Sequence, residues 1–218
     1  MTNNARVVFQ TSKPTTLTFD CYGTLIDWEN GACRALRDIY GFSQHEVTDE
    51  ALIALFLQND ARIIRENIFR YSNVLQRVAQ SIAKVLGVRS DSALEARFFH
   101  SLPTWRTFEE TNTCLTRLAR CYRMAIISNV DDQLLSQMVR QFSVPFDVMV
   151  TSEQIKSYKP NQAIFDRAVE LIGEHPNRII RRGALRGDPC QSTWHGKHLG
   201  RKVSAMGATP SLMPLLLV

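Results

Sequence analysis

The chain has 218 residues and a formal net charge of +5, with 44% hydrophobic and 22% charged side chains. This size and balance fit one large domain, or a core with one insertion, and exclude a disordered chain. The apolar runs near both ends are shorter than the roughly 18 residues that a membrane-spanning helix needs, and the start lacks a signal-peptide pattern. Five cysteines without a Cys-x-x-Cys pair favour neither a disulfide framework nor zinc. We therefore expect a cytoplasmic protein that does not act at a membrane.

The surplus positive charge is confined to the end of the chain. Residues 1–172 contain equal numbers of basic and acidic side chains, so the whole surplus falls in residues 173–218. A basic tail can bind phosphate backbones, but no aromatic interleaving or recognition motif accompanies this one. We expect a small-molecule substrate and no nucleic-acid partner.

The hydrophobic pattern predicts strands that alternate with helices. Residues 15–19 alternate and end on an apolar residue, which is typical of a buried strand. From residue 30 to about 101 the period is helical, and Pro103 ends this stretch. The later part predicts strands at 124–127 and 146–150 and helices at 132–141 and 160–172.

This order of elements favours an α/β fold. We expect a Rossmann-like parallel sheet core formed by residues 1–27 and 105–218. The helical stretch, residues 28–104, is then an all-helical cap inserted after the first strand.

Polar residues follow the end of each predicted strand. Asp20 follows the first strand, Ser128 and Asn129 follow the second, and Lys159 lies a few residues after the third. In an open parallel sheet the reactive loops lie beyond the carboxyl ends of the strands, so these side chains should converge.

The converging residues suggest nucleophilic chemistry. A carboxylate at the end of a buried strand needs a cation to offset the loss of hydration, and Lys159 could provide it for Asp20. An ionised and oriented carboxylate can act as a covalent nucleophile. Thr24 could hydrogen-bond one oxygen of Asp20, while Ser128 and Asn129 could fix a polar substrate. The alternative is that Asp20 only caps the turn after the strand.

Three segments carry a resemblance to a known family. They are Phe19-Asp20-Cys21-Tyr22-Gly23-Thr24-Leu25, Ile127-Ser128-Asn129 and Tyr158-Lys159-Pro160-Asn161-Gln162-Ala163-Ile164-Phe165. In this order and spacing they resemble the haloacid dehalogenase superfamily of hydrolases, and within it the type II 2-haloacid dehalogenases. The resemblance implies a Rossmann-like core with a helical cap, and a homodimer formed through cap helices. It implies catalytic roles for Asp20, Lys159 and Ser128, and substrate binding by Tyr22, Thr24 and Asn129.

The residue two places after the nucleophile bears on the reaction. Phosphatases of this superfamily carry a second Asp there, which acts as general acid and helps to hold magnesium, whereas this chain has Tyr22. A phenol with a pKa of about 10 is a poor acid at neutral pH, but a departing halide needs no proton. The resemblance therefore implies that Asp20 displaces halide from a 2-haloacid, that water hydrolyses the resulting ester, and that no metal or other cofactor is required. The alternative is a magnesium-dependent small-molecule phosphatase.

The chain departs from the family pattern in the cap and after the lysine. Dehalogenases of this branch present a cap arginine to the substrate, and the best ungapped placement puts Leu57 there. Arg62 and Arg65 are the nearest cations, and solvated helix surface is the alternative role for both. Phe165 stands where the family has a tyrosine.

The C-terminal segment is also atypical. Residues 178–190 contain two isoleucines, four arginines and Asp188, which is displaced from the acidic loop that the superfamily places beside the nucleophile. We expect this segment to be loosely packed with its arginines exposed, and His195, His198 and Cys190 to form no zinc site. A change of reading frame near Arg181 would explain the charge shift. The chain could then be a catalytically impaired family member.

Overall fold

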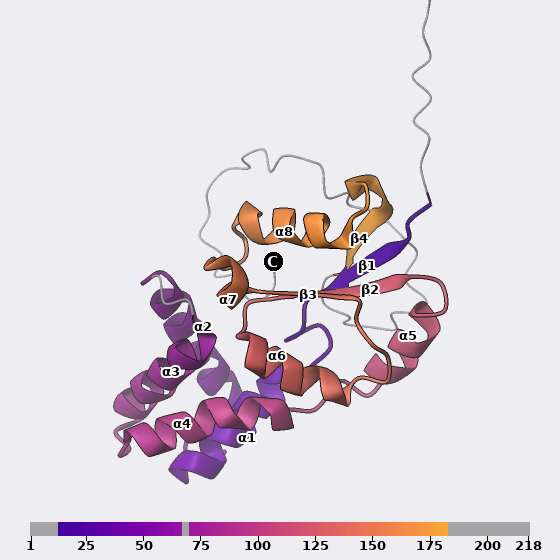
Figure 1. Ribbon diagram of the computed structural model, residues 1–218. Coiled ribbons are helices and arrows are strands. Elements are labelled where there is room, and N and C mark those ends of the chain that lie inside the picture. The colour runs from indigo at the N-terminus through magenta and orange to yellow at the C-terminus, as the bar shows by residue number, and fades with distance from the viewer. Residues whose placement is uncertain (1–12, 67–69, 183–218) are drawn as a thin grey trace, which may run out of the picture.

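The computed structural model describes residues 13–66 and 70–182. Four parallel strands form one sheet in the order β3-β2-β1-β4 (Figure 1). The strands are β1 (Thr16–Phe19), β2 (Arg123–Ser128), β3 (Val148–Thr151) and β4 (Ile179–Arg182). The predicted α/β class with a parallel sheet is confirmed.

The sheet is covered on both faces, as the apolar composition of its strands requires. Successive side chains of a strand point to opposite faces. Accordingly, Ile127 of β2 packs with Ile164 and Phe165 of α8 (Gln162–Ile172). Ile126 belongs to the larger core cluster, which includes Leu134 of α6 (Asp132–Met138). Figure 1 shows α8 on one side of the sheet and α6 on the other.

The other elements of this part of the chain are short. They are α5 (Thr111–Leu118), α7 (Ser152–Ile155), and the 3-10 turns η1 (Leu102–Thr104), η2 (Val139–Gln141) and η3 (Pro176–Arg178).

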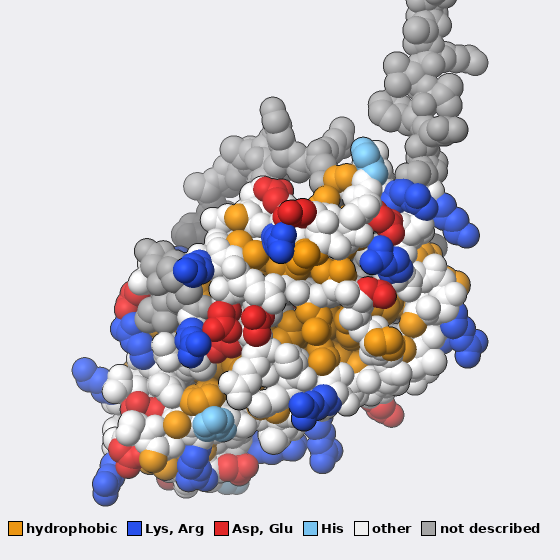
Figure 2. Space-filling view, in the orientation of Figure 1, with side chains coloured by type: hydrophobic (Ala, Val, Ile, Leu, Met, Phe, Trp, Pro, Cys, Tyr) orange, Lys and Arg blue, Asp and Glu red, His pale blue; other side chains and the backbone are white. Residues whose placement is uncertain are grey.

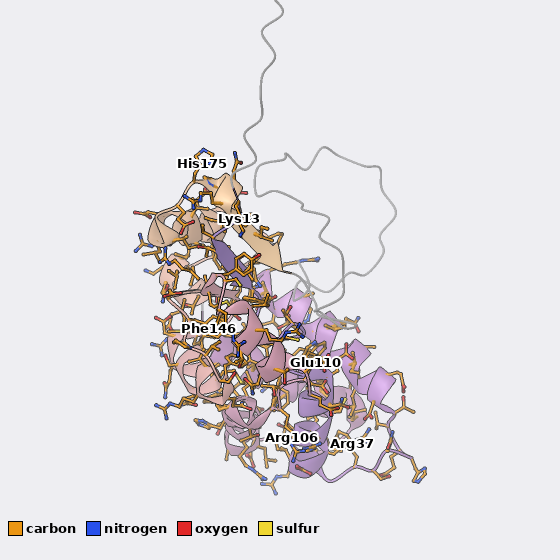
Figure 3. The ribbon with its side chains drawn as sticks, turned by 90° about the vertical axis from the view of Figure 1, so that its right-hand side faces the viewer. Lys13, Arg37, Arg106, Glu110, Phe146 and His175 are labelled. Atoms are coloured by element: carbon orange, nitrogen blue, oxygen red, sulfur yellow. The ribbon has the colours of Figure 1, made fainter. Side chains whose placement is uncertain are left out.

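Four helices lie beside the sheet layer, and we call them the cap (Figures 1 and 3). They are α1 (Trp28–Tyr40), α2 (Asp49–Ile64), α3 (Tyr71–Leu86) and α4 (Ser92–Ser101). In Figure 3 the labelled Arg37 of α1 lies toward one end of the molecule and His175 of the sheet layer lies at the other.

Local sequence signals set the ends of the cap helices. Thr48 Oγ1 accepts a hydrogen bond from Ala51 N at the start of α2, and Asp91 Oδ1 accepts from Ala93 N and Leu94 N at the start of α4. Gly87 ends α3 with a φ of 67°, in the left-handed region where glycine carries little strain.

The structure corrects one expectation about the C-terminal segment. Residues 179–182 pair with β1, from Thr16↔Ile179 to Phe19↔Arg182, so their loose packing was predicted wrongly. Ile179 is buried against Ala125 and Ile172, which explains how a segment with two isoleucines packs at the end of the sheet that the described residues form. Arg178 is exposed, as expected. Asp188, Cys190, His195 and His198 lie outside the described residues.

Charged side chains of both signs are interspersed on the face shown in Figure 2. Within the described residues, no helix has both the length and the apolar composition needed to cross a membrane.

Candidate functional site

The ends of three strands bring the predicted site residues together. Asp20 follows β1, Ser128 is the last residue of β2, and Lys159 follows β3 and α7. Lys159 Nζ lies 2.6 Å from Asp20 Oδ2 in an ion pair whose side chains are 2% and 12% exposed, respectively. Ser128 is buried beside Asn129 at the same edge of the sheet. The loops thus converge where the parallel topology predicts.

Lys159 is fixed by both its side chain and its main chain. Its ammonium group donates a second hydrogen bond, of 3.1 Å, to the carbonyl oxygen of Ile127. The Lys159 main-chain N–H donates to Asn129 Oδ1 at 2.7 Å, and Asn129 Nδ2 donates to the Lys159 carbonyl at 3.5 Å. A buried ammonium with several hydrogen bonds and a carboxylate partner keeps its charge at a defined position. The Asn129 amide, expected to contact substrate, is therefore engaged with Lys159.

The second carboxylate oxygen of Asp20 has a main-chain partner. Asp20 Oδ1 accepts a hydrogen bond of 2.7 Å from the amide of Cys21. Thr24 is buried, but among the described residues its hydroxyl makes no hydrogen bond to Asp20. The bond expected from Thr24 is therefore replaced by one from the adjacent peptide. Within the described part of the chain each carboxylate oxygen of Asp20 thus has one donor and keeps a lone pair for chemistry.

The loop after Asp20 is a tight turn built around Gly23. Gly23 has a φ of 79°, and its N–H donates to the carbonyl of Ile26 at 2.9 Å. Leu25 N and Ile26 N both donate to the carbonyl of Cys21. This turn directs the chain into the cap and leaves Tyr22 facing it.

A small aromatic cavity lies between this turn and the cap. Its lining residues are apolar or aromatic: Tyr22, Trp28, Phe56, Tyr71, Leu75, Leu102 and Trp105. The Tyr22 ring meets Trp105 edge-on at 5.9 Å between centroids. Burial raises the pKa of Tyr22 well above its ordinary value, so its hydroxyl is a neutral phenol at neutral pH.

Among the described residues of the cap, no arginine lines this cavity. Leu57 is half-buried and packs against the core. Arg62 and Arg65 are exposed, and Arg62 pairs with Glu66 at 3.1 Å. Phe165 is buried and lines a second small cavity together with Asp20 and Lys159.

The sequence reasoning missed two buried acids, of which Asp131 joins the cap to the core and Asp60 lies within the cap. Asp131, after β2, accepts hydrogen bonds from Tyr71 N (2.5 Å) and Ser72 N (2.9 Å) and so caps α3 from outside. Asp60 of α2 is 2% exposed and hydrogen-bonds the Tyr71 side chain. Burial raises the pKa of Asp60 to about 7. The sequence could have indicated the burial of Asp60, because it lies one helical turn after the apolar Phe56 and therefore on the same face of the helix.

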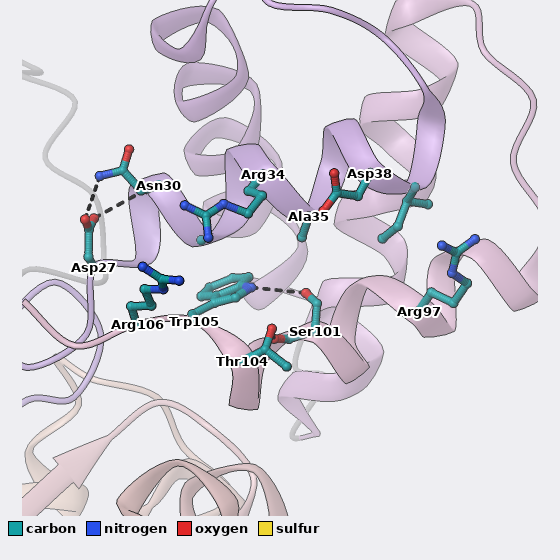
Figure 4. Close-up of a pocket in the computed structure, with 12 residues that line it drawn as sticks. Asp27, Asn30, Arg34, Ala35, Asp38, Arg97, Ser101, Thr104, Trp105 and Arg106 are labelled. Carbon is teal, nitrogen blue, oxygen red and sulfur yellow. Dashed lines mark hydrogen bonds between the residues drawn. The ribbon is translucent and has the colours of Figure 1, made fainter. Parts of the chain in front are cut away.

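A larger cavity of about 300 Å³ lies between α1, α4 and residues 104–106 (Figure 4). It shares Trp105 with the aromatic cavity, and Trp105 Nε1 donates to Ser101 Oγ at 3.1 Å. Arg34, Arg97 and Arg106 surround it together with Asp27 and Asp38. None of the predicted site residues lines this cavity.

The described residues contain no group of three or more His, Cys, Asp or Glu side chains that could hold a metal ion.

Comparisons with known proteins agree with the fold. A family model described as haloacid dehalogenase-like hydrolase matches residues 17–183. The (S)-2-haloacid dehalogenase 4A of Burkholderia cepacia is 22% identical over 169 residues, which are 74% of this chain and 71% of that protein.

Solved structures show the same arrangement at low identity. An L-2-haloacid dehalogenase from Xanthobacter autotrophicus matches with a TM-score of 0.67 and 19% identity, covering 77% of this chain and 69% of that one. The magnesium-bound putative HAD-hydrolase YfnB from Bacillus subtilis matches with a TM-score of 0.66 and 18% identity, covering 78% and 79%. At these identities the likeness shows the fold alone.

Proposed function

The chain belongs to the haloacid dehalogenase-like hydrolase family, and from this premise we propose that it hydrolyses the carbon–halogen bond of small 2-haloacids through an ester on Asp20. The buried ion pair of 2.6 Å between Asp20 and Lys159 is the observation that carries the proposal. It holds a carboxylate beside a cation in a fixed orientation, at the small cavity that Asp20 lines with Lys159 and Phe165, and a fixed, charged carboxylate is what this kind of nucleophile requires.

The proposed reaction has two steps. A carboxylate oxygen of Asp20 attacks carbon two of the substrate, a carbon–oxygen bond forms, and halide leaves with the electron pair of the carbon–halogen bond. Water then adds to the Asp20 carbonyl carbon and releases the 2-hydroxy acid. One proton of this water remains on the product hydroxyl and the other passes to solvent, which regenerates the carboxylate.

The named residues take separate parts in this reaction. Lys159 holds Asp20 in place before attack and stabilises the carboxylate that returns after hydrolysis. Asn129 positions Lys159 through its main chain. Tyr22, two residues after Asp20, is buried and keeps water out of the space between the Gly23 turn and the cap.

A magnesium-dependent phosphatase is the second candidate, because a magnesium-bound hydrolase shares the fold. In such an enzyme Asp20 would hold the ion and a second acid would protonate the leaving alcohol. The position of that acid is Tyr22, a buried phenol whose pKa is raised, so the described residues offer no proton donor of suitable strength there. This observation favours halide as the leaving group.

Parallel assays separate the candidates. Chloride release from 2-chloropropionate is measured beside hydrolysis of p-nitrophenyl phosphate with and without magnesium. The proposal expects chloride release independent of added magnesium and abolished in Asp20→Asn. Phosphate release that depends on magnesium, without chloride release, would establish the phosphatase instead. A folded protein that releases neither chloride nor phosphate would be a catalytically impaired family member.

A further inference from the structure

The cavity of about 300 Å³ between α1, α4 and residues 104–106 is separate from the site of the proposed reaction. Among the described residues, its lining has no member in common with the small cavity that Asp20 lines with Lys159 and Phe165. Its volume lies at the lower end of the range of small-molecule binding sites, about 300–1,000 Å³. The cavity is therefore large enough for a ligand of its own.

Three arginines line this cavity, and none of them forms an ion pair within the described residues. They are Arg34 of α1, Arg97 of α4, and Arg106 of the segment that leads from the cap back to the sheet layer. In Figure 4 the guanidinium groups of Arg34 and Arg106 both lie toward the Trp105 ring, and Arg97 lies at the other end of the cavity. Because like charges repel each other, two guanidinium groups at one end of a cavity favour an anion beside them.

Two acids also line the cavity, but they leave these two arginines available. Asp27 is engaged at the start of α1, where its Oδ1 accepts from Asn30 N at 3.4 Å and its Oδ2 accepts from Asn30 Nδ2 at 2.6 Å. Asp38 is exposed, and in Figure 4 it lies on the same side of Ala35 as Arg97. Three arginines against two acids leave the lining of the cavity with a net positive charge.

The main chain holds Arg106 in place beside α1. Asp27 N donates to the carbonyl of Arg106 at 2.9 Å, and Ile26 and Thr107 form an antiparallel bridge. The two segments that join the cap to the sheet layer thus run side by side at this cavity. Since Arg34 stands on a helix and Arg106 on this paired segment, binding of an anion needs little rearrangement of the backbone.

The Trp105 ring forms a flat, apolar part of the cavity wall. Its Nε1 already donates to Ser101 Oγ at 3.1 Å, so the ring offers its apolar surface. Gly31 lets the ring lie against α1, because a Cβ at this position would be 2.4 Å from Trp105 Cγ. Ala35 and Ile39 extend the apolar lining along α1. The cavity thus combines cations with an apolar wall.

Going beyond the proposed function, we infer that this cavity is a second binding site, which takes a small organic anion. Arg34 and Arg106 bind the phosphate or carboxylate group of this ligand, and its apolar part packs against Trp105. A guanidinium group presents parallel N–H donors whose spacing matches the oxygens of either group. This inference does not depend on whether the protein releases chloride.

The test measures binding of phenylphosphonate and of benzoate to the full chain by calorimetry. Neither probe contains a carbon–halogen bond or a phosphate ester, so neither candidate activity consumes it. Dissociation constants are determined for the wild type, Arg34→Gln, Arg106→Gln and Arg89→Gln, and circular dichroism confirms that each variant is folded. Arg89 is the matched control, because it is an exposed arginine of the cap that is absent from the cavity lining.

The wild type should bind at least one probe, and Arg34→Gln and Arg106→Gln should each weaken that binding about tenfold or more. Arg89→Gln should bind as the wild type does. Tighter binding of phenylphosphonate supports the site with a phosphate ligand, and tighter binding of benzoate supports it with a carboxylate ligand.

Three results would overturn the inference. The first is a folded wild type that binds neither probe at millimolar concentration. The second is the same dissociation constant in the wild type and in both cavity variants, which would place the probe elsewhere on the protein. The third is an equal loss in Arg89→Gln, which would show that only the overall charge of the cap matters.

Discussion

Lys159 Nζ reaches Asp20 Oδ2 across the end of the strand that separates their loops. Asp20 follows β1 and Lys159 follows β3, and β2 lies between these two strands. On its way the ammonium donates to the carbonyl of Ile127 in β2, and Asn129, just after β2, holds the Lys159 main chain. The strand β2 and the residue that follows it thus hold Lys159 in position beside Asp20.

Asp20→Asn should abolish turnover, because a neutral amide is a poor nucleophile. The protein should remain folded, since the side chain has the same size and can still accept from Cys21 N. Chloride release and circular dichroism check both points. In single turnover in ¹⁸O-labelled water the wild type should carry the label in Asp20, because water attacks the ester carbonyl. Label in the product alone would contradict the ester intermediate.

Lys159→Met should reduce kcat about 100-fold or more, by analogy with the loss of a single charge-stabilising donor from an active site. The change removes the partner 2.6 Å from Asp20 and leaves the Ile127 carbonyl without its donor. Lys156→Met is the matched control, since Lys156 is exposed and lies three residues away. Equal and small losses in the two variants would place Lys159 outside the catalytic machinery.

Asn129→Ala should lower kcat more than it raises KM. The variant loses both hydrogen bonds to the Lys159 main chain, which should cost about 1–3 kcal/mol of stability and loosen the ammonium. Asn112→Ala is the control, because Asn112 makes a similar pair of bonds, to Gln141 O and from Ser143 N, away from the site. Asn112→Ala should lose about as much stability as Asn129→Ala, while its kcat should stay unchanged. A rise in KM alone for Asn129→Ala would favour direct substrate contact.

The sequence predicted the convergence of Asp20, Ser128 and Lys159 because parallel topology alone places the ends of neighbouring strands together. Contacts that depend on how the cap packs against the core could not be predicted from the sequence. The bonds from Tyr71 and Ser72 to Asp131 need the observed seating of the cap on the core, which no local pattern encodes. The spacing led us to expect a hydrogen bond from Thr24 to Asp20. In the structure the main-chain N–H of Cys21, the next residue, donates to Asp20 instead.

The strand Ile179–Arg182 illustrates a second limit. Its arginines argued against burial, yet among the described residues it pairs with β1 along one side only, and this backbone pairing does not depend on side-chain polarity. Counting apolar residues therefore underestimates strands at the edge of a sheet.

Asp60→Asn should change how stability depends on pH. The pKa of Asp60 is about 7 in the folded protein against an ordinary 3.8, so between these values the folded state holds a proton that the unfolded state has lost. Stability from this group is complete below about pH 4 and is lost as pH rises toward 7. Between pH 5 and 8 the wild type should lose about 3 kcal/mol relative to Asp60→Asn. Urea unfolding of both proteins at each pH measures it, and a loss of the opposite sign would show that Asp60 is charged in the fold.

Gly31→Ala should destabilise the protein although it replaces glycine within a helix. In an open helix position this change usually stabilises by about 1 kcal/mol. Here a Cβ would lie 2.4 Å from Cγ of Trp105, whose buried ring is packed against Tyr22 and Phe98. Overpacking of this kind costs about 1–3 kcal/mol, so the clash should outweigh the gain in helix propensity.

The Gly31→Ala prediction is checked by thermal unfolding, with Arg34→Ala as the control one turn along α1. Arg34 is exposed, so its truncation should change stability by less than about 0.5 kcal/mol. A higher melting temperature for Gly31→Ala would mean that α1 and Trp105 separate at little cost, and that Trp105 does not fix the shape of the aromatic cavity.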